Sequence, residues 1–355
     1  MNLHTLGWDA TREQEFAPLQ SSGLEPARVV TVDKHHFGVL PRSGDFLLAR
    51  APGRFLHRVT RPAELPKVGD WLAIRRVPGE EKALVECVLT RRTWLSRKEP
   101  GREVEEQVLV TNVDVVFVVQ SLDAAFNLRL LQRQLVMARE GGAQPVVLLN
   151  KADLCTEVEQ RLAEASGTAG GAPVLVVSAR TRRGIPQVRD WLKPARTVVF
   201  IGASGVGKSS LINRLYGEEV QATTEVRESD SKGRHTTTWR ELIVLPGGAL
   251  VIDTPGMREV HMWLATEGVH EAFPDIEALA TLCHFRDCSH SHEARCAVKE
   301  ALATGQLTRD RYEQFVKLQR EFAFLEQAQA QRNYSERKRF MRVAHRSFNK
   351  QKPAG

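Results

Sequence analysis

Long hydrophobic runs and paired cysteines are both missing from this sequence. No run approaches the roughly 18 apolar residues of a membrane span, and the first residues, MNLHTLGWDATREQEF, lack the apolar core of a signal peptide. Cysteine occurs only five times in 355 residues, an odd count that does not suit a secreted disulfide scaffold. We therefore expect a cytoplasmic protein with no membrane association. Nothing indicates an obligate oligomer, so we expect a monomer.

The sequence does contain an uneven basic excess. Lys and Arg number 50 against 43 Asp and Glu, a formal net charge of +7, and 42% of residues are hydrophobic, enough for two or three folded domains. Residues 331–355 hold eight basic residues and one acid, and residues 50–102 hold thirteen basic residues and six acids. The two basic regions flank a neutral to acidic middle, which indicates a polyanionic partner such as RNA.

The N-terminal region reads as a small β-barrel. After an extension over 1–27, apolar and β-branched residues predict five strands within 28–40, 45–51, 55–60, 70–77 and 83–97. We expect an OB-like barrel over 28–100, whose open face would bind oligonucleotides. Its candidate phosphate contacts are Arg58, Arg61, Lys67, Arg75, Arg76, Arg91 and Arg92. An SH3-like barrel whose arginines only solvate the surface is the alternative.

Residues 101–260 alternate apolar runs with helical stretches, which predicts a parallel α/β sheet covered on both faces. Expected strands lie at 113–119, 145–149, 173–178, 197–202, 241–245 and 249–253, and expected helices at 127–140, 155–166, 184–192 and from 208. A polar helical region follows over 261–330, with a long helix from 309 to about 331. A basic tail, 331–355, ends the chain.

A P-loop pattern lies between the fourth of these strands and its helix, where phosphate binding requires it. Glycines let backbone N–H groups surround phosphates, Lys208 reaches the β and γ phosphates, and the hydroxyl of Ser209 ligates Mg²⁺. Ser210 adds a further phosphate contact. The predicted phosphate-binding residues are Gly202, Ala203, Ser204, Gly205, Val206, Gly207, Lys208, Ser209 and Ser210.

Two other strand ends carry the pattern of a guanine site. Asn150, Lys151, Ala152 and Asp153 follow one buried strand, and the Asp153 carboxylate can accept two hydrogen bonds that guanine offers and adenine does not. Ser178 and Ala179 end the next strand, and their backbone would contact the guanine oxygen. Together with the P-loop, these motifs predict guanine-nucleotide binding.

The segment between the P-loop helix and Asp253 is polar and reads as a switch loop. Asp253, in the run DTPG, would make the second Mg²⁺ contact, and Gly256 can turn its N–H toward a γ-phosphate. A threonine among 236–238, for which we choose Thr237, would add a Mg²⁺ ligand. Met257 stands where many GTPases carry a water-orienting glutamine, so slow intrinsic hydrolysis is expected, with His235 as the candidate for positioning water.

The motif order is permuted. GTPases generally run P-loop, switch, DxxG, NKxD and SA, whereas this chain runs NKAD, SAR, P-loop, switch and DTPG. Because strand neighbours define a parallel sheet, a circular permutation leaves the site intact. The predicted class is therefore α/β: a circularly permuted P-loop GTPase domain, an OB-like β-barrel before it and an α-helical zinc-binding domain after it.

A metal site is predicted beyond the GTPase region. Cys283, Cys288, His290 and Cys296 offer three thiolates and one imidazole, the donor set of a closed tetrahedral Zn²⁺ site. His292 is the alternative imidazole. With no open coordination position, the zinc would be structural.

In the tail, basic side chains alternate with aromatic ones, Tyr334, Phe340 and Phe348, a mixture that suits RNA. A solvated helix end is the alternative.

Taken in order, the barrel, NKAD, SAR, GASGVGKSS, GRHTTT, DTPGMRE and CHFRDCSHSHEARCAVKEA resemble the small-ribosomal-subunit-dependent GTPase family RsgA, also called YjeQ. The resemblance implies a GTP hydrolase that binds GTP, GDP and the 30S subunit with its 16S rRNA, is stimulated by that subunit and assists its late maturation and factor release. It also implies zinc on the Cys3His cluster. A GTP- and RNA-binding protein without turnover, or a GTPase that regulates a protein partner, are the alternatives.

Overall fold

In a computed structural model the chain forms two compact units. The first unit comprises residues 1–97 and 106–262, and the second comprises 98–105 and 263–355. The structure describes residues 2–33, 36–98, 106–123, 126–203, 205–217, 241–253, 273–285, 288–290, 292–317 and 319–320.

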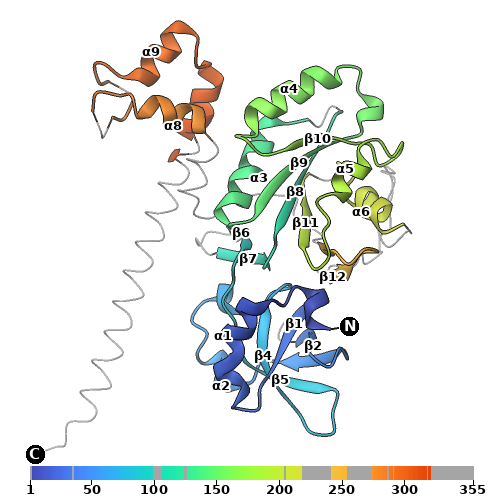
Figure 1. The fold of residues 1–355 in the computed structure, drawn as a ribbon. Helices are drawn as coiled ribbons and strands as arrows, with labels where there is room; N and C mark the ends of the chain where they lie inside the picture. Colours follow the sequence, from blue (N-terminus) through green and yellow to red (C-terminus); the bar gives the residue numbers. More distant parts are fainter. Residues whose placement is uncertain are drawn as a thin grey trace, which may run out of the picture. The chain divides into compact units, whose positions relative to one another are not determined.

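The N-terminal part of the first unit contains a closed barrel (Figure 1). Its strands are β1 (Glu25–Asp33), β2 (His36–Pro41), β3 (Leu47–Arg50), β4 (Trp71–Arg76) and β5 (Lys82–Val88). They follow the order β1-β2-β3-β5-β4, β4 pairs back with β1, and β3 runs parallel to β5. This closed five-stranded order confirms the OB-like barrel. Side chains such as Val29, Phe37 and Leu72 point inward and form its core.

The barrel differs from the predicted strands in three places. Residues 28–40 form two paired strands rather than one. The strand expected at 55–60 is wrong: Pro52 precedes a helical turn, α2 (Gly53–Leu56), that buries Phe55 in the barrel core. The last expected strand divides into β5 and β6 (Trp94–Lys98), and β6 pairs with β7 (Glu106–Thr111), which the pattern did not predict.

Helical residues at the N-terminus cover one side of the barrel. Asp9 begins α1 (Ala10–Gln20) by accepting a hydrogen bond from the backbone N–H of Arg12, after a short 3-10 turn, η1 (Leu3–Leu6). Trp8 packs edge-on against both Phe16 of α1 and Trp71 of β4, with ring centroids 5.9 and 4.9 Å apart. A second 3-10 turn, η2 (Pro62–Glu64), lies between β3 and β4 in the chain.

The rest of the first unit is the α/β domain. Its strands are β8 (Val115–Ser121), β9 (Gln144–Asn150), β10 (Val174–Val176), β11 (Thr197–Ile201), β12 (Glu241–Val244) and β13 (Leu250–Asp253), in the order β10-β9-β8-β11-β13-β12. All are parallel except β12, which is antiparallel to β13. The predicted parallel sheet is confirmed, and its strands begin and end within a few residues of expectation.

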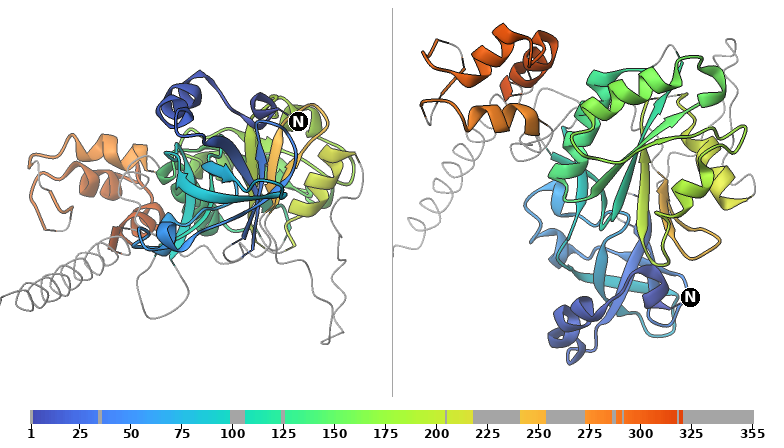
Figure 2. Two further views of the ribbon diagram at one scale, coloured as in Figure 1. Left: turned by 90° about the horizontal axis from the view of Figure 1, so that it is seen from below. Right: turned by 45° about the horizontal axis from the view of Figure 1, so that its top comes forward.

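Helices cover both faces of this sheet (Figure 2). Alternate residues of β8 show why: Val116 and Val118 belong to a core with α3 (Leu128–Glu140) and α4 (Val158–Thr168), whereas Phe117 belongs to a core with α5 (Ile185–Arg189) and α6 (Lys208–Tyr216). A third 3-10 turn, η3 (Ala152–Leu154), follows β9.

The barrel and the α/β sheet are hydrogen-bonded to each other. Thr31 of β1 pairs with Glu241 of β12, which makes the two sheets continuous. Arg28 of β1 is fully buried and donates hydrogen bonds to the carbonyl oxygens of Leu6 and Asn112 and to Oγ1 of Thr197, where β11 begins. One guanidinium group therefore links the N-terminal turn, the barrel and the sheet.

The second unit is helical where it is described. It contains α8 (Pro274–Ala280), α9 (Ala297–Thr304) and a helix that covers 309–317. Phe273 and Phe315 pack edge to face with centroids 5.2 Å apart, and Arg311 pairs with Asp275 at 2.8 Å. Residues 319–320 are also helical, whereas position 318, positions 321–331 of the expected helix and the tail 331–355 lie outside the described residues. None of the helices described across the chain is long and apolar enough to cross a membrane.

Candidate functional site

The turn between β11 and α6 has the backbone of a phosphate cradle. Gly202, Gly205 and Gly207 have φ values of 152, 78 and 94°. A Cβ atom on Gly207 would lie 2.3 Å from Nδ2 of Asn150, so only glycine fits there. Backbone N–H groups at a helix N-terminus reached through such a turn attract phosphate.

Lys208 begins α6, and its ammonium group donates to the carbonyl oxygens of Gly202 and Ala203 at 2.9 and 2.8 Å. The positive charge is thus held at the loop that would surround the phosphates. Ser209 and Ser210 lie on the first turn of the same helix. Ser204 lies outside the described residues.

Asn150 connects the two halves of the pocket. Its side-chain Nδ2 donates to the carbonyl oxygen of Val206 at 2.8 Å, and its Oδ1 accepts from the N–H of Ala179 at 3.1 Å. The residue is 1% exposed, so both hydrogen bonds are shielded from water. One amide therefore fixes the end of β9 against the P-loop and against the loop after β10. The backbone at Ala179 is expected to contact guanine, but its N–H group donates to Asn150 in this structure.

The carboxylate of Asp153 is held in place beside this amide. Oγ of Ser178 donates to Oδ1 of Asp153 at 2.6 Å. This hydrogen bond positions the carboxylate, and both of its oxygens keep lone pairs that could accept from a base. Ala152 is buried between Lys151 and Asp153.

Two positioning contacts involve residues that no motif contains. Lys151 has a left-handed backbone, φ 61°, and its Nζ forms an ion pair with Oδ2 of Asp123 at 2.8 Å. Arg214 of α6 donates from Nε to the carbonyl oxygen of Ala179 at 2.9 Å. Asp123 lies two residues beyond β8, so the rule that ligands bind at the carboxyl ends of parallel strands could have found it.

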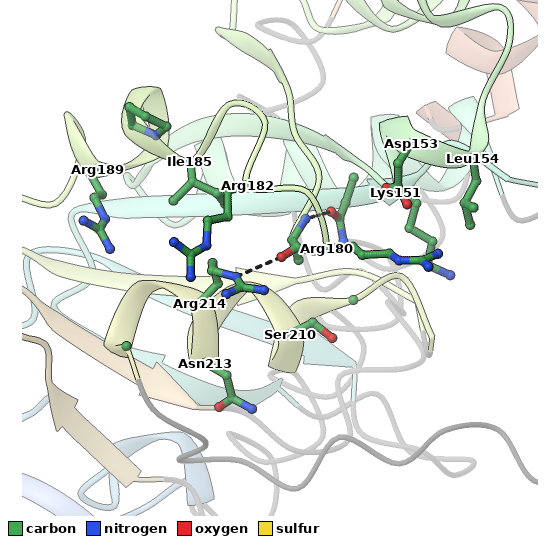
Figure 3. Close-up of a pocket in the computed structure, with 15 residues that line it drawn as sticks. Lys151, Asp153, Leu154, Arg180, Arg182, Ile185, Arg189, Ser210, Asn213 and Arg214 are labelled. Atoms are coloured by element: carbon green, nitrogen blue, oxygen red, sulfur yellow. Dashed lines mark hydrogen bonds between the residues drawn. The ribbon is translucent and has the colours of Figure 1, made fainter.

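Part of this set lines one cavity of about 840 Å³, within the range of small-molecule sites (Figure 3). The cavity extends along α6 beneath the loop after β10 and α5. Six of the predicted nucleotide-binding residues line it: Asn150, Lys151, Asp153, Ala179, Gly207 and Ser210.

The remaining predicted residues are described only in part or not at all. Asp253 is the last residue of β13, the strand beside β11, and its side chain is not described. His235, Thr237 and Gly256 lie outside the described part of the chain.

The second unit brings its three cysteines and His290 together. The donor atoms of Cys283, Cys288, His290 and Cys296 all lie within 4.8 Å of one another. The Sγ atoms of Cys283 and Cys296 are 3.8 Å apart. Metal–sulfur bonds of about 2.3 Å in a tetrahedron place neighbouring sulfurs about 3.8 Å apart, so the cluster fits a tetrahedral metal ion. The cluster contains His290 and not His292.

Local backbone shapes this candidate metal site. His290 has a left-handed backbone, φ 58°, and its carbonyl oxygen accepts a hydrogen bond from the hydroxyl of Tyr312 at 3.1 Å. Desolvation opposes ionisation of Cys283, but backbone N–H groups of Val298 and Ala297 outweigh it and lower the pKa of this thiol. Desolvation raises the pKa of Cys288 to about 11, and its hydrogen bonds to the other two thiols add to the increase.

Strand order and motif positions together define the class. The segments predicted to recognise the base follow β9 and β10, and the P-loop pattern follows β11, later in the chain. A parallel sheet with this order of site segments is a circularly permuted P-loop GTPase.

Comparison with known proteins identifies the family. The family described as RsgA GTPase matches residues 88–263. The chain is 46% identical to the small ribosomal subunit biogenesis GTPase RsgA of Opitutus terrae over 91% of this chain and 90% of that protein. It is 36% identical to RsgA 2 of Lactiplantibacillus plantarum over 98% and 99% of the two chains. The chain belongs to the RsgA GTPase family and is a GTP hydrolase.

Solved structures agree with this assignment. YjeQ from Thermotoga maritima aligns with a TM-score of 0.62 at 27% identity, over 84% of this chain and 99% of that one. YloQ, described as a circularly permuted GTPase, aligns with a TM-score of 0.58 at 24% identity, over 84% and 95% of the two chains. The second likeness supports the permuted fold alone.

Proposed function

We propose that this GTPase binds the 30S ribosomal subunit through its 16S rRNA, hydrolyses GTP when bound to it, and assists late maturation of the subunit and release of assembly factors. The observation that carries the proposal is the cavity lined by the predicted guanine-nucleotide residues, in a chain whose relatives are named small ribosomal subunit biogenesis GTPases. GTP favours docking and hydrolysis favours release, so the protein acts as a timer.

The proposed site keeps the predicted roles. Asp153 recognises guanine, Lys208 neutralises the β and γ phosphates, and Mg²⁺ neutralises charge between these phosphates when bound. Ser209, Thr237 and Asp253 would hold the Mg²⁺ ion, Gly256 would contact the γ-phosphate and His235 would position water. Of these, the Ser209 hydroxyl belongs to the described structure and suits a hard cation.

We further propose that the Cys3His cluster holds structural Zn²⁺, because three thiolates and one imidazole around a tetrahedral point favour this ion. The domain division at 27, 100, 260 and 330 is part of the proposal. So is a cytoplasmic, monomeric state.

Steady-state hydrolysis tests the proposal directly. GTP and ATP turnover would be measured with no addition, with purified 30S subunits and with 50S subunits as control. We expect GTP turnover to be slow alone and to rise at least about tenfold with 30S only. No stimulation, despite measurable GTP binding, would favour either an RNA-binding protein without turnover or a GTPase activated by a protein partner.

A further inference from the structure

The loop after β10 has an excess of positive charge that the nucleotide site does not require. Residues 178–196 contain six basic residues and a single acid, Asp190. Arg180, Arg182, Arg183 and Arg189 are exposed, and none of them forms an ion pair with a carboxylate in the described structure. Among the residues that the structure describes, their charges therefore have no carboxylate counter-ion.

The arginines of the barrel are different, because most have acidic partners. Of the seven barrel residues predicted to contact phosphate, five are ion-paired within the first unit: Arg61 with Glu64, Arg75 with Glu86, Arg76 with Glu25, Arg91 with Asp70 and Arg92 with Asp9. Arg91 also donates to the carbonyl oxygens of Ala63 and Leu65, which gives it a structural part. A paired guanidinium attracts a further phosphate less strongly than an unpaired one.

The loop backbone fixes where these arginines lie. The N–H of Ser178 donates to the carbonyl oxygen of Arg183 at 2.9 Å and closes the loop. Arg182 has a left-handed backbone, φ 67°. A Cβ atom on Gly184 would lie 2.2 Å from the carbonyl oxygen of Val176, so the turn packs tightly on β10. A closed, tightly packed loop presents its side chains with little loss of entropy on binding.

Three of these four arginines border the nucleotide cavity. Arg180, Arg182 and Arg189 line it from the loop and α5, and Arg214 lies opposite them on α6 (Figure 3). Arg180 extends toward Lys151 and Asp153, so an anion held by it would lie beside the predicted base site, whereas Arg182 and Arg189 lie at the other end of the cavity.

We propose that these four arginines bind the phosphodiester backbone of RNA on the partner particle. Arg180, Arg182 and Arg189, which line the cavity, and their exposed neighbour Arg183 are here called the groove. The inference rests on the proposed function and adds a contact surface in the GTPase domain itself. The planar guanidinium matches phosphate oxygens with two parallel hydrogen bonds, which favours phosphate over other anionic surfaces.

The same loop would couple RNA to nucleotide. Ser178 and Ala179, at its start, hold Asp153 and Asn150 by hydrogen bonds of 2.6 and 3.1 Å. RNA bound to the arginines that follow Ala179 would stabilise the positions of Asp153 and Asn150 that guanine binding requires. By linkage, nucleotide then raises RNA affinity by the same factor.

The test compares two full-length variants that lose equal charge. Arg182→Gln/Arg183→Gln removes two unpaired arginines of the groove, and Gln is as tolerant of the left-handed backbone as Arg. The control, Arg42→Gln/Arg161→Gln, removes two arginines that are paired with Glu13 and Glu164 in the same unit. Binding to a 16S rRNA transcript and to 30S subunits is measured between about 50 and 200 mM salt, and fluorescent GDP binding in parallel.

We expect the groove variant to bind transcript and 30S about tenfold more weakly than wild type. The slope of the logarithm of the binding constant against the logarithm of salt concentration should become shallower by about one to two. The control should stay within about twofold of wild type. GDP affinity without RNA is compared in the single variant Arg183→Gln, a position that does not line the nucleotide cavity, and should stay within about twofold of wild type. An unchanged RNA slope, or equal losses in both variants, overturns the inference. A tenfold loss of GDP affinity with unchanged RNA slope would assign the arginines to the nucleotide instead.

The two proposals fail separately. If 30S neither binds wild type nor stimulates GTP turnover, the proposed function is wrong, while the transcript measurements still decide whether the groove binds RNA. If wild type binds no transcript either, the groove proposal is also wrong.

Discussion

Asp123 orients one side chain of the proposed guanine pocket without itself lining the cavity. Lys151 has a flexible four-carbon stem, and the ion pair of its Nζ with Asp123 at 2.8 Å selects one orientation of that stem. Both side chains are 31% exposed, so solvent weakens the pair but does not abolish it.

We expect Asp123→Asn to weaken GDP and GTP binding because the Lys151 stem then loses entropy when the base enters. The pair contributes about 0.2–1 kcal/mol, which corresponds to a roughly 1.5- to 5-fold rise in Kd. Fluorescent GDP titration measures this rise. Asp190→Asn, an exposed aspartate on the same domain, is the control, and Asp123→Glu should restore most of the affinity. Equal affinities in all variants would mean that Lys151 is positioned by other contacts.

Asp153 should determine which base is accepted. Asp153→Asn removes the charged acceptor for two guanine N–H donors, each contributing about 1.5–3 kcal/mol, so GTP affinity should fall at least 100-fold. Xanthine carries a carbonyl oxygen where guanine carries its amino group, and the Asn side chain can donate to it. Competition between GTP and XTP measures the change. A variant that still prefers GTP would exclude Asp153 as the base-recognition group.

Residue-level prediction worked where local chemistry dictates residue type. The spacing of glycines predicts a phosphate loop, and Gly207, which has no room for a Cβ atom, shows why the spacing is informative. Asp123 and Arg214 carried no such signal, because each acts through one contact with a residue distant in the sequence. The arginines after Ser178 form a basic run in the sequence. A charge count over the whole middle of the chain conceals this run, because acidic residues elsewhere in that region balance it.

At the level of elements, β1 is the strand that joins the two folds. It closes the barrel with β4 and pairs through Thr31 with β12, while Arg28 donates to Thr197 at the start of β11. Burial lowers the pKa of Arg28 to about 10, which still leaves it charged at neutral pH. The strand that leads to the P-loop is therefore fixed to the barrel by a buried charge.

Arg28→Met should destabilise the first unit strongly, because the buried acceptors of Leu6, Asn112 and Thr197 lose their donor. With about 1–3 kcal/mol for each unsatisfied group, the unfolding free energy should fall by about 3 kcal/mol or more. Urea unfolding measures it. Arg75→Met, on the neighbouring strand β4, removes a half-exposed arginine and should cost less than about 1 kcal/mol. Similar losses in both variants would contradict a special part for Arg28.

Element prediction succeeded in the α/β domain and was weaker in the barrel for one physical reason. Strands such as β8 are buried on both faces and read as continuous apolar runs, which turns and helices then delimit. Barrel strands are short, so a four-residue helix such as α2 can bury one aromatic residue, Phe55, within an equally apolar segment. Pairing between β6 and β7 joins residues across 99–105, which no local pattern indicates.

At the level of the whole molecule, the permutation changes what the switch segment connects. Residues 218–240 link α6 to β12, and Glu241, the first residue of β12, pairs directly with Thr31 of the barrel. The predicted switch segment therefore leads directly into β12, the strand that pairs with the barrel. The motif order predicted this permutation, whereas the β1–β12 pairing could be known only from the structure.

The two units should respond separately to loss of metal. The described core of the second unit is small and includes Phe273, Ile276, Val298 and Phe315, so a tetrahedral ion would supply much of its stability. Structural zinc binds with an apparent free energy of about 10–16 kcal/mol, and removing one thiolate forfeits much of this.

We expect Cys288→Ser to lose its metal and the cooperative thermal transition of α8 and α9, measured by mass spectrometry of metal content and by circular dichroism. GDP affinity should stay within about twofold, because every residue that lines the proposed nucleotide cavity belongs to the first unit. Cys155→Ser is the matched control, since Cys155 is a free thiol of the first unit. One full equivalent of metal retained by Cys288→Ser would exclude Cys288 as a ligand, and an equal loss in Cys155→Ser would mean that the metal binds elsewhere.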